Sequence, residues 1–166
     1  MNQPVVTDSV GEAPVQVKPE TSVDTSDWKT YRNEEYGFEM KYPKEYVIFD
    51  DYQNRKTLFL SFPENKVHRV EGIFLRLSDE ALTPEGVLQQ IKKNNVVGGM
   101  DRLISDESVT VGEDILARKI VHTAEIGYNP EHYFFDVNGY RAEIEIRIAM
   151  PFTEEILKTV VIRGSN

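Results

Sequence analysis

The stretch NEEYGFEMKYP, residues 33–43, decides the start of the folded part of this chain. After Gly37, apolar and charged side chains alternate as in a strand with one buried face (Phe38, Met40 and Tyr42 against Glu39 and Lys41). Pro43 ends the strand because it cannot donate a ladder hydrogen bond. We expect Tyr36 and Gly37 to form the preceding turn, where glycine is required by a positive φ or by a close contact. Aromatic residues at strand spacing usually belong to a core, so this stretch predicts structure rather than a binding site.

Upstream, residues 1–27 have the composition of a flexible linker. They contain no aromatic residue, leucine or isoleucine, and their acidic residues far outnumber the single base, Lys18. Such a segment cannot bury enough apolar surface to offset the conformational entropy that it would lose. We therefore predict a disordered tail over residues 1–27 and one folded domain over residues 28–166. The alternative is an edge strand built from Val15 and Val17.

Downstream, short apolar runs of period two predict further strands over residues 47–49, 58–62 and 73–77. Two later segments predict hairpins. The first covers residues 108–125 and turns at 112–114, and the second covers residues 131–148 and turns at Asn138-Gly139. An Asn-Gly pair is the strongest short hairpin signal, because both residues tolerate positive φ.

Two segments predict helices. In residues 82–95, Thr83 suits the N-cap and Pro84 the first helical position. In residues 152–164, Thr153 is the expected N-cap, followed by apolar residues that would face the core (Ile156, Leu157 and Val160). Together the patterns predict an α+β fold, with an antiparallel sheet of about six to seven strands covered by helices.

Composition excludes several classes of protein. The formal net charge is −9, which argues against binding to nucleic acid and against simple adsorption on anionic lipid. The chain has no cysteine, so it contains no disulfide, thiolate metal site or cysteine nucleophile. No apolar run approaches the about 18 residues of a membrane helix, and residues 1–27 lack the basic and apolar regions of a signal peptide. The sequence is also compatible with a signal peptide that was cleaved off before this chain was formed.

The segment TYRNEEYGFEMKYPKEY, residues 30–46, resembles the entry motif of the PsbP-like domains. That family includes the extrinsic PsbP subunit of photosystem II and many bacterial relatives, often lipoproteins of unknown role. The shared residues are Tyr31, Asn33, Tyr36-Gly37-Phe38, Tyr42-Pro43 and Tyr46. Near the other end, residues 156–160 read ILKTV where family members commonly have ILxTF, so Val160 replaces the usual aromatic residue. The resemblance spans residues 28–163, but only its two ends are specific.

The resemblance implies an α/β/α sandwich around an antiparallel sheet, a fold that a eukaryotic Ran-binding protein shares. It also implies a cell-envelope lipoprotein in which residues 1–27 are the spacer after a lipid-anchored cysteine that this chain lacks. Fold alone does not give function. No residue here matches the metal or partner sites of the photosynthetic subunit, so the resemblance implies no cofactor and no site residues.

No catalytic constellation is recognisable in the sequence. The histidines His68, His122 and His132 form neither an HxH nor an HExxH motif. We predict no catalytic, cofactor-binding or metal-ligating residues. The alternative is that His122 and His132 lie on neighbouring strands and bind zinc or manganese, whereas solvated or hydrogen-bonded histidines are the default. Glu143 and Glu145 share a strand face, which predicts a solvated charged face or a partly paired face under a helix layer.

The segment GYNPEHYFF, residues 127–135, predicts a contact surface for a protein partner. Tyr128, Asn129, His132 and Tyr133 would form it, because exposed aromatic residues on loops often make protein contacts. The alternative is an ordinary connection between two strands.

Three functions follow from these observations. The first is a non-catalytic binding or assembly domain, tethered outside the cytoplasmic membrane, with a protein partner, no nucleic acid and no membrane contact beyond the tether. It predicts a monomer with no deep polar pocket. The second is a small hydrolase whose residues meet only on folding, and the third is a cytosolic adaptor for a small GTPase. Two strongly shifted pKa values in a His-lined or acidic cleft would favour the hydrolase.

Overall fold

The computed structural model of the chain describes residues 23–50, 57–63, 72–77, 82–96, 99–124 and 127–164. Within them the chain forms two helices, α1 (Pro84–Val96) and α2 (Thr153–Lys158), and ten strands. The strands are β1 (Lys29–Asn33), β2 (Phe38–Tyr42), β3 (Val47–Asp50), β4 (Thr57–Ser61), β5 (Ile73–Leu77), β6 (Leu103–Val111), β7 (Ile115–His122), β8 (Glu131–Val137), β9 (Tyr140–Ile146) and β10 (Val161–Ile162).

The strands form two antiparallel sheets. One has seven strands in the order β3-β4-β5-β9-β8-β7-β6, and the other has three in the order β1-β2-β10. The predicted α+β class is confirmed, and the sequence had not predicted the second sheet. The side chains of β1 are mostly exposed and do not alternate, and β10 has only two residues, so neither strand gives a clear period-two signal.

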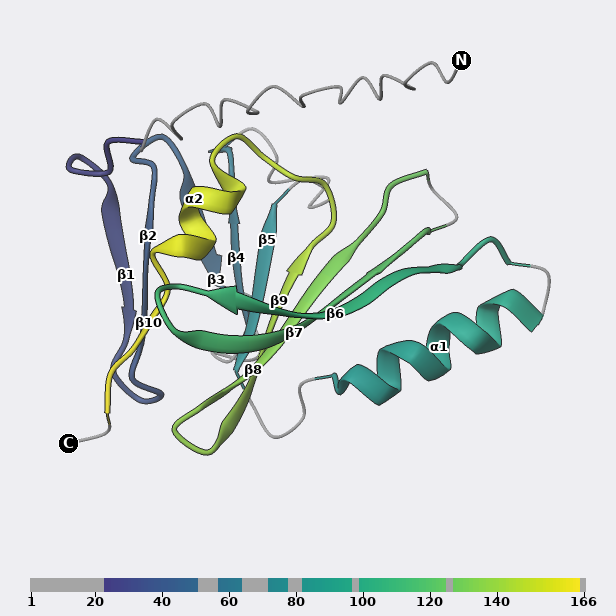
Figure 1. Cartoon of the computed structure of the whole chain (residues 1–166). Helices are drawn as coiled ribbons and strands as arrows, with labels where there is room; N and C mark the ends of the chain where they lie inside the picture. The colour runs from purple at the N-terminus through teal and green to yellow at the C-terminus, as the bar shows by residue number, and fades with distance from the viewer. Residues whose placement is uncertain are drawn as a thin grey trace, which may run out of the picture.

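The elements stack in three layers (Figure 1). The three-stranded sheet and α2 cover one face of the seven-stranded sheet, and α1 lies on its other face. The main core fills the space between the two sheets and includes Phe38 of β2, Ile144 of β9 and Ile156 of α2. On the other face, Val87 and Ile91 of α1 belong to a much smaller apolar cluster (Val87, Ile91, Ile120 and Phe134).

Gly37 joins the two segments on which the sequence resemblance rests. Its φ is +68°, and a β-carbon there would collide with the carbonyl oxygen of Arg163. Both reasons given for a glycine are therefore confirmed. The amide of Arg163 donates to the carbonyl of Gly37 at 2.7 Å, and β10 pairs with β2. The entry motif and the C-terminal segment thus hold each other in place.

Local signals account for most of the turns and caps. The Oγ1 of Thr83 accepts a hydrogen bond from the amide of Gly86 at 2.9 Å, which confirms the predicted N-cap of α1. Hairpin β8–β9 turns at Asn138 (φ 48°) and Gly139 (φ 86°), as predicted. The turn at residues 112–114 between β6 and β7 is also confirmed.

The predicted N-cap of α2 is wrong. The helix begins at Thr153, and its N-cap is Phe152, in the left-handed conformation at φ 64°. The hydroxyl of Thr153 turns back instead, where it donates to the carbonyl of Met150 at 2.7 Å and accepts from the Met150 amide at 2.9 Å. A threonine before two glutamates fits either the N-cap or the first helical position, and the hydrogen bonds between the buried residues Met150 and Thr153 accompany the second.

The predicted disordered tail falls mainly on residues 1–22, which lie outside the described residues. The alternative edge strand at Val15 and Val17 therefore lies outside them too, as does His68. Contacts with the main core begin at Trp28, which is partly buried and meets Phe152 edge-on with ring centroids 5.9 Å apart. Of the helices described, none combines the length and apolar character needed to span a membrane.

Candidate functional site: a polar pocket beside helix α1

Strand β9 places two carboxylates on the α1 side of the seven-stranded sheet. Its alternation sends Ile144 and Ile146 into the main core and sends Glu143 and Glu145 to the opposite face. Glu143 is 0 % exposed and Glu145 is 8 % exposed. The predicted solvated face is therefore wrong, and the predicted paired face agrees with the structure. Strand β9 lies between β5 and β8; Arg76 of β5 contacts both carboxylates, and His132 of β8 contacts Glu143.

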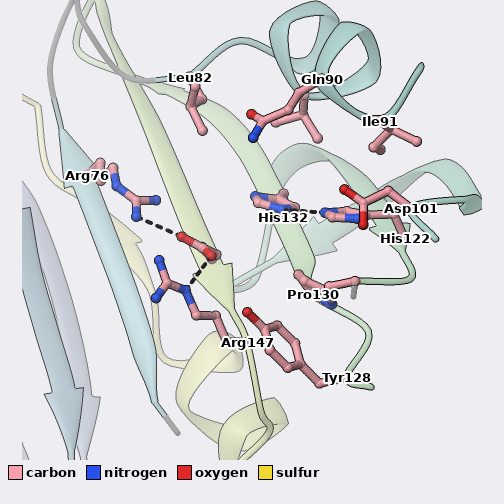
Figure 2. Close-up of a pocket in the computed structure, with 13 residues that line it drawn as sticks. Arg76, Leu82, Gln90, Ile91, Asp101, His122, Tyr128, Pro130, His132 and Arg147 are labelled. Atoms are coloured by element: carbon pink, nitrogen blue, oxygen red, sulfur yellow. Dashed lines mark hydrogen bonds and ion pairs between the residues drawn. The ribbon is translucent and has the colours of Figure 1, made fainter. Parts of the chain in front are cut away.

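Two guanidinium groups neutralise these carboxylates. Arg76 of β5 contacts Glu145 at 2.7 Å and Glu143 at 3.2 Å. The Nε of Arg147 donates to the other oxygen of Glu145 at 2.7 Å, so both guanidinium groups converge on one carboxylate (Figure 2). Burial alone would raise the pKa of Glu145, but Arg147 and Arg76 outweigh it and lower that pKa. The longer Arg76–Glu143 contact is an ion pair without hydrogen-bond geometry.

A chain of hydrogen bonds runs from Glu143 through two histidines to the end of β7. The Oε1 of Glu143 lies 3.0 Å from Nδ1 of His132, whose Nε2 lies 3.2 Å from Nε2 of His122. The Nδ1 of His122 lies 2.8 Å from the carbonyl oxygen of Thr123. We call Glu143, His132 and His122 the imidazole chain. Burial, with a smaller contribution from His132, lowers the pKa of His122 and favours its neutral form.

The histidine pair has the geometry of a hydrogen bond rather than of a shared metal. The ring centroids are 5.4 Å apart, which is the 3.2 Å N–N distance plus about one ring radius at each end, so the two nitrogens point at each other. Two nitrogens on one tetrahedral zinc ion lie about equally far apart, but their lone pairs point at the metal and not at each other. Among the described residues, no three His, Cys, Asp or Glu side chains are grouped so as to hold a metal ion.

A pocket of about 390 Å³ opens between α1 and this polar face, contrary to the expectation that a binding domain of this kind has no deep polar pocket. Leu82, Val87 and Ile91 line its apolar side. The opposite side is polar and contains both guanidinium groups, Glu145 and the two histidines (Figure 2). A mixed concave surface of this kind is where a binding site is expected, with apolar walls for affinity and a few polar groups for orientation.

The four residues of the predicted contact loop do not share one surface. Tyr128 is half-buried and lines the pocket, and Asn129 is exposed. His132 and Tyr133 are buried in β8, and because they are adjacent in a strand they point to opposite faces. His132 faces the pocket, whereas Tyr133 belongs to the main core. Burial raises the pKa of Tyr133 to about 12, and its hydroxyl donates to Glu131 at 2.6 Å.

Sequence reasoning paired His122 with His132 correctly as neighbours but missed the role of Arg76. The signal was present, because Arg76 is the only charged residue of the otherwise apolar strand IFLRL. A lone charge in a buried strand needs a partner, and the two acids of the EIEI segment also alternate with apolar residues. The sequence could not show that β5 and β9 are neighbours.

Comparison with known proteins supports the fold. A solution structure of cyanobacterial PsbP, from Synechocystis sp. PCC 6803, superposes with a TM-score of 0.54 and covers 91 % of this chain and 100 % of the other. The two sequences are 11 % identical, so the likeness is one of fold. No protein-family model and no curated protein matches the chain. The PsbP-like fold implied by the sequence motifs is thereby confirmed.

Proposed function

We propose that this protein is a non-catalytic binding or assembly domain whose partner is another protein, contacted at the mouth of the pocket. The observation that carries the proposal is a group of exposed apolar side chains beside that mouth. Met100 is 68 % exposed and Leu103 is 48 % exposed. Aromatic and methionine side chains are enriched in the centres of protein interfaces.

The backbone connects these side chains to the pocket. Leu103 of β6 is the cross-strand partner of His122 on β7, so their side chains lie on the same face. The hydroxyl of Thr123 donates to the carbonyl of Met100, and the amide of Arg102 donates to that hydroxyl at 2.8 Å. Asp101, between them, lines the pocket. Tyr128 and Asn129 of the predicted contact loop complete the proposed surface.

The pocket offers little support for the hydrolase alternative. A general base needs a free nitrogen or oxygen within hydrogen-bond distance of the substrate. Both ring nitrogens of His122 and of His132 already have partners inside the protein. The two carboxylates are likewise held by guanidinium groups or by His132. The cytosolic adaptor hypothesis rests on fold analogy alone.

The proposal includes a monomeric domain tethered outside the cytoplasmic membrane, as a lipid-anchored or secreted protein. Its support is the PsbP-like fold together with the linker-like composition of residues 1–27. The coding sequence upstream of Met1 tests this part. An apolar segment ending in a lipobox cysteine would support it, and a native start at Met1 would favour the cytosolic adaptor.

Site-specific photo-cross-linking in the native host tests the partner surface. A photoreactive residue is placed at position 100, and the matched control places it at Leu116, an apolar side chain that is 74 % exposed and lies outside the proposed surface. We expect a discrete protein adduct from position 100 and none from position 116. Met100→Glu should abolish adduct formation by a reporter at Asn129, whereas Leu116→Glu should not. Equal adducts from both positions would contradict the proposed surface.

A further inference from the structure

The three hydrogen bonds of the imidazole chain require one more proton than two neutral histidines and an ionised carboxylate carry. The carbonyl of Thr123 can only accept, so Nδ1 of His122 is protonated and Nε2 of a neutral His122 is an acceptor. The Nε2 of His132 must then donate across the 3.2 Å contact. One further proton is needed between Nδ1 of His132 and Oε1 of Glu143. Three links therefore need three protons, and the two neutral histidines supply two.

Without the extra proton, one link must become repulsive whichever tautomers are chosen. Two lone pairs would face each other between His122 and His132, or a lone pair of His132 would face the Glu143 carboxylate. In the third arrangement, a lone pair of His122 would face the carbonyl oxygen of Thr123. An unpaired buried polar atom is costly, so deprotonation should move the member that is least enclosed. That member is His122, because His132 and Glu143 are buried.

The charges around the imidazole chain come from several elements and largely oppose one another. Arg76 of β5 and Arg147, which follows β9, disfavour an added proton. Glu145 of β9 and Asp101, which precedes β6, favour it. Tyr128 lines the pocket from the loop before β8, and the residues of α1 that line it carry no charge (Val87, Gln90 and Ile91). No single neighbouring charge therefore dominates the proton affinity of the imidazole chain. The need to supply a proton to each of its three hydrogen bonds decides whether the extra proton is held.

We propose that Glu143, His132 and His122 form a proton-binding site that controls the shape of the pocket. With the proton bound, His122 stays against His132 and the pocket is open. When the proton leaves, the His122 ring turns away from His132 towards the pocket, which it lines. Its neighbour Thr123 is bonded to Met100 and Arg102, so the change reaches the mouth. This inference rests on the proposed function, because it concerns regulation of the same pocket.

Imidazole ¹⁵N and carboxyl ¹³C NMR of the whole chain tests the proposal. The series runs from about pH 5 to about pH 9, on both sides of the ordinary histidine value of about 6.5. At low pH we expect His122 to have one protonated nitrogen, Nδ1, and the extra proton to appear on His132 or Glu143. As the pH rises, that proton should leave, and the amides of Ala124, Gly127 and Tyr128 should shift with the same midpoint.

Glu143→Gln is the discriminating variant. Its amide can donate to Nδ1 of His132 while its oxygen faces Arg76, so every link is satisfied with neutral histidines. We expect the two histidines and the pocket amides to become independent of pH over the same range. The matched control is Glu131→Gln on the same strand as His132, which should titrate as the unmodified chain does. If Glu143→Gln does not fold, the shifts of the unmodified chain decide alone.

Two results would overturn the proposal. One is that neither His132 nor Glu143 holds a proton at the low end of the series. The other is that the pocket amides titrate identically in the unmodified chain and in Glu143→Gln. Neither result depends on a partner. A pH-linked pocket without a cross-linked partner would sink only the proposed function, and a cross-linked partner with a pH-independent pocket would sink only this inference.

Discussion

The two faces of the seven-stranded sheet are made by alternate residues of the same strands, yet they differ in kind. On one face, Leu75, Ile144 and Tyr133 join a continuous apolar core under the smaller sheet and α2. On the other face, their neighbours Arg76, Glu143 and His132 form a buried ionic network beside α1. Apolar burial is favourable in itself, whereas a buried charge is tolerated only when its partners are in place. The core face therefore stabilises the fold by apolar burial alone, whereas the polar face depends on the complete set of its ionic partners.

The largest effect is expected on the core face. Ile144→Ala removes a fully buried side chain between the two sheets and leaves a cavity. We expect the free energy of unfolding to fall by about 4 kcal/mol, within the usual range for such truncations. Denaturant unfolding followed by tryptophan fluorescence of Trp28 measures it. A loss below about 1 kcal/mol would mean that this face is not the main source of stability.

Arg76→Met tests the polar face. Removal of the guanidinium leaves Glu143 buried without its cation, and breaking a buried pair in this way typically costs about 3 kcal/mol. Adding Glu143→Gln should recover much of that loss, because the uncompensated charge is gone. The two single variants and the double variant form a thermodynamic cycle. Additive losses would show that the two side chains do not interact.

A smaller effect should appear in the acid stability of the fold. The pKa of Glu145 is held below its ordinary value of 4.5, so its contribution to stability is complete above that value. Glu145 binds a proton more readily in the unfolded chain than in the folded chain. Its contribution to the free energy of unfolding is therefore lost as the pH falls through the pKa that Glu145 has in the folded chain. Thermal unfolding below pH 4.5 should show a steeper loss for the unmodified chain than for Glu145→Gln. Equal slopes would mean that Arg147 and Arg76 do not stabilise the ionised carboxylate.

The smallest effect concerns the helix that covers the polar face. Thr83→Ala removes the N-cap hydrogen bond of α1 and should cost about 1 kcal/mol. Thr110→Ala, on the exposed edge strand β6, is the matched control and should change stability little. Hydrogen exchange of the first amides of α1 localises the loss. Equal losses from both variants would place the effect elsewhere than at the cap.

Caps and turns were predicted correctly where the signal depends on residues that are close together in the sequence. The N-cap at Thr83, the turn at Asn138-Gly139 and the positive φ of Gly37 each follow from the chemistry of one or two side chains. The predicted N-cap of α2 was wrong because a threonine in this pattern fits either the N-cap or the first helical position, and the hydrogen bonds of Thr153 with Met150 accompany the second. Strands β1 and β10 were missed because pairing with β2, rather than their own periodicity, makes them strands.

An acidic chain without cysteine and an α+β domain with an antiparallel sheet could be predicted from the residues alone. The sequence also allowed His122 and His132 to lie on neighbouring strands, which the pairing of β7 with β8 confirms. The pairing of β5 with β9, which brings Arg76 to Glu143 and Glu145, became known from the folded chain. The physical reason is that alternation fixes the face on which a side chain lies, whereas strand order fixes its partner across the sheet. A buried charge depends on that partner, so the polar pocket became visible only in the folded chain.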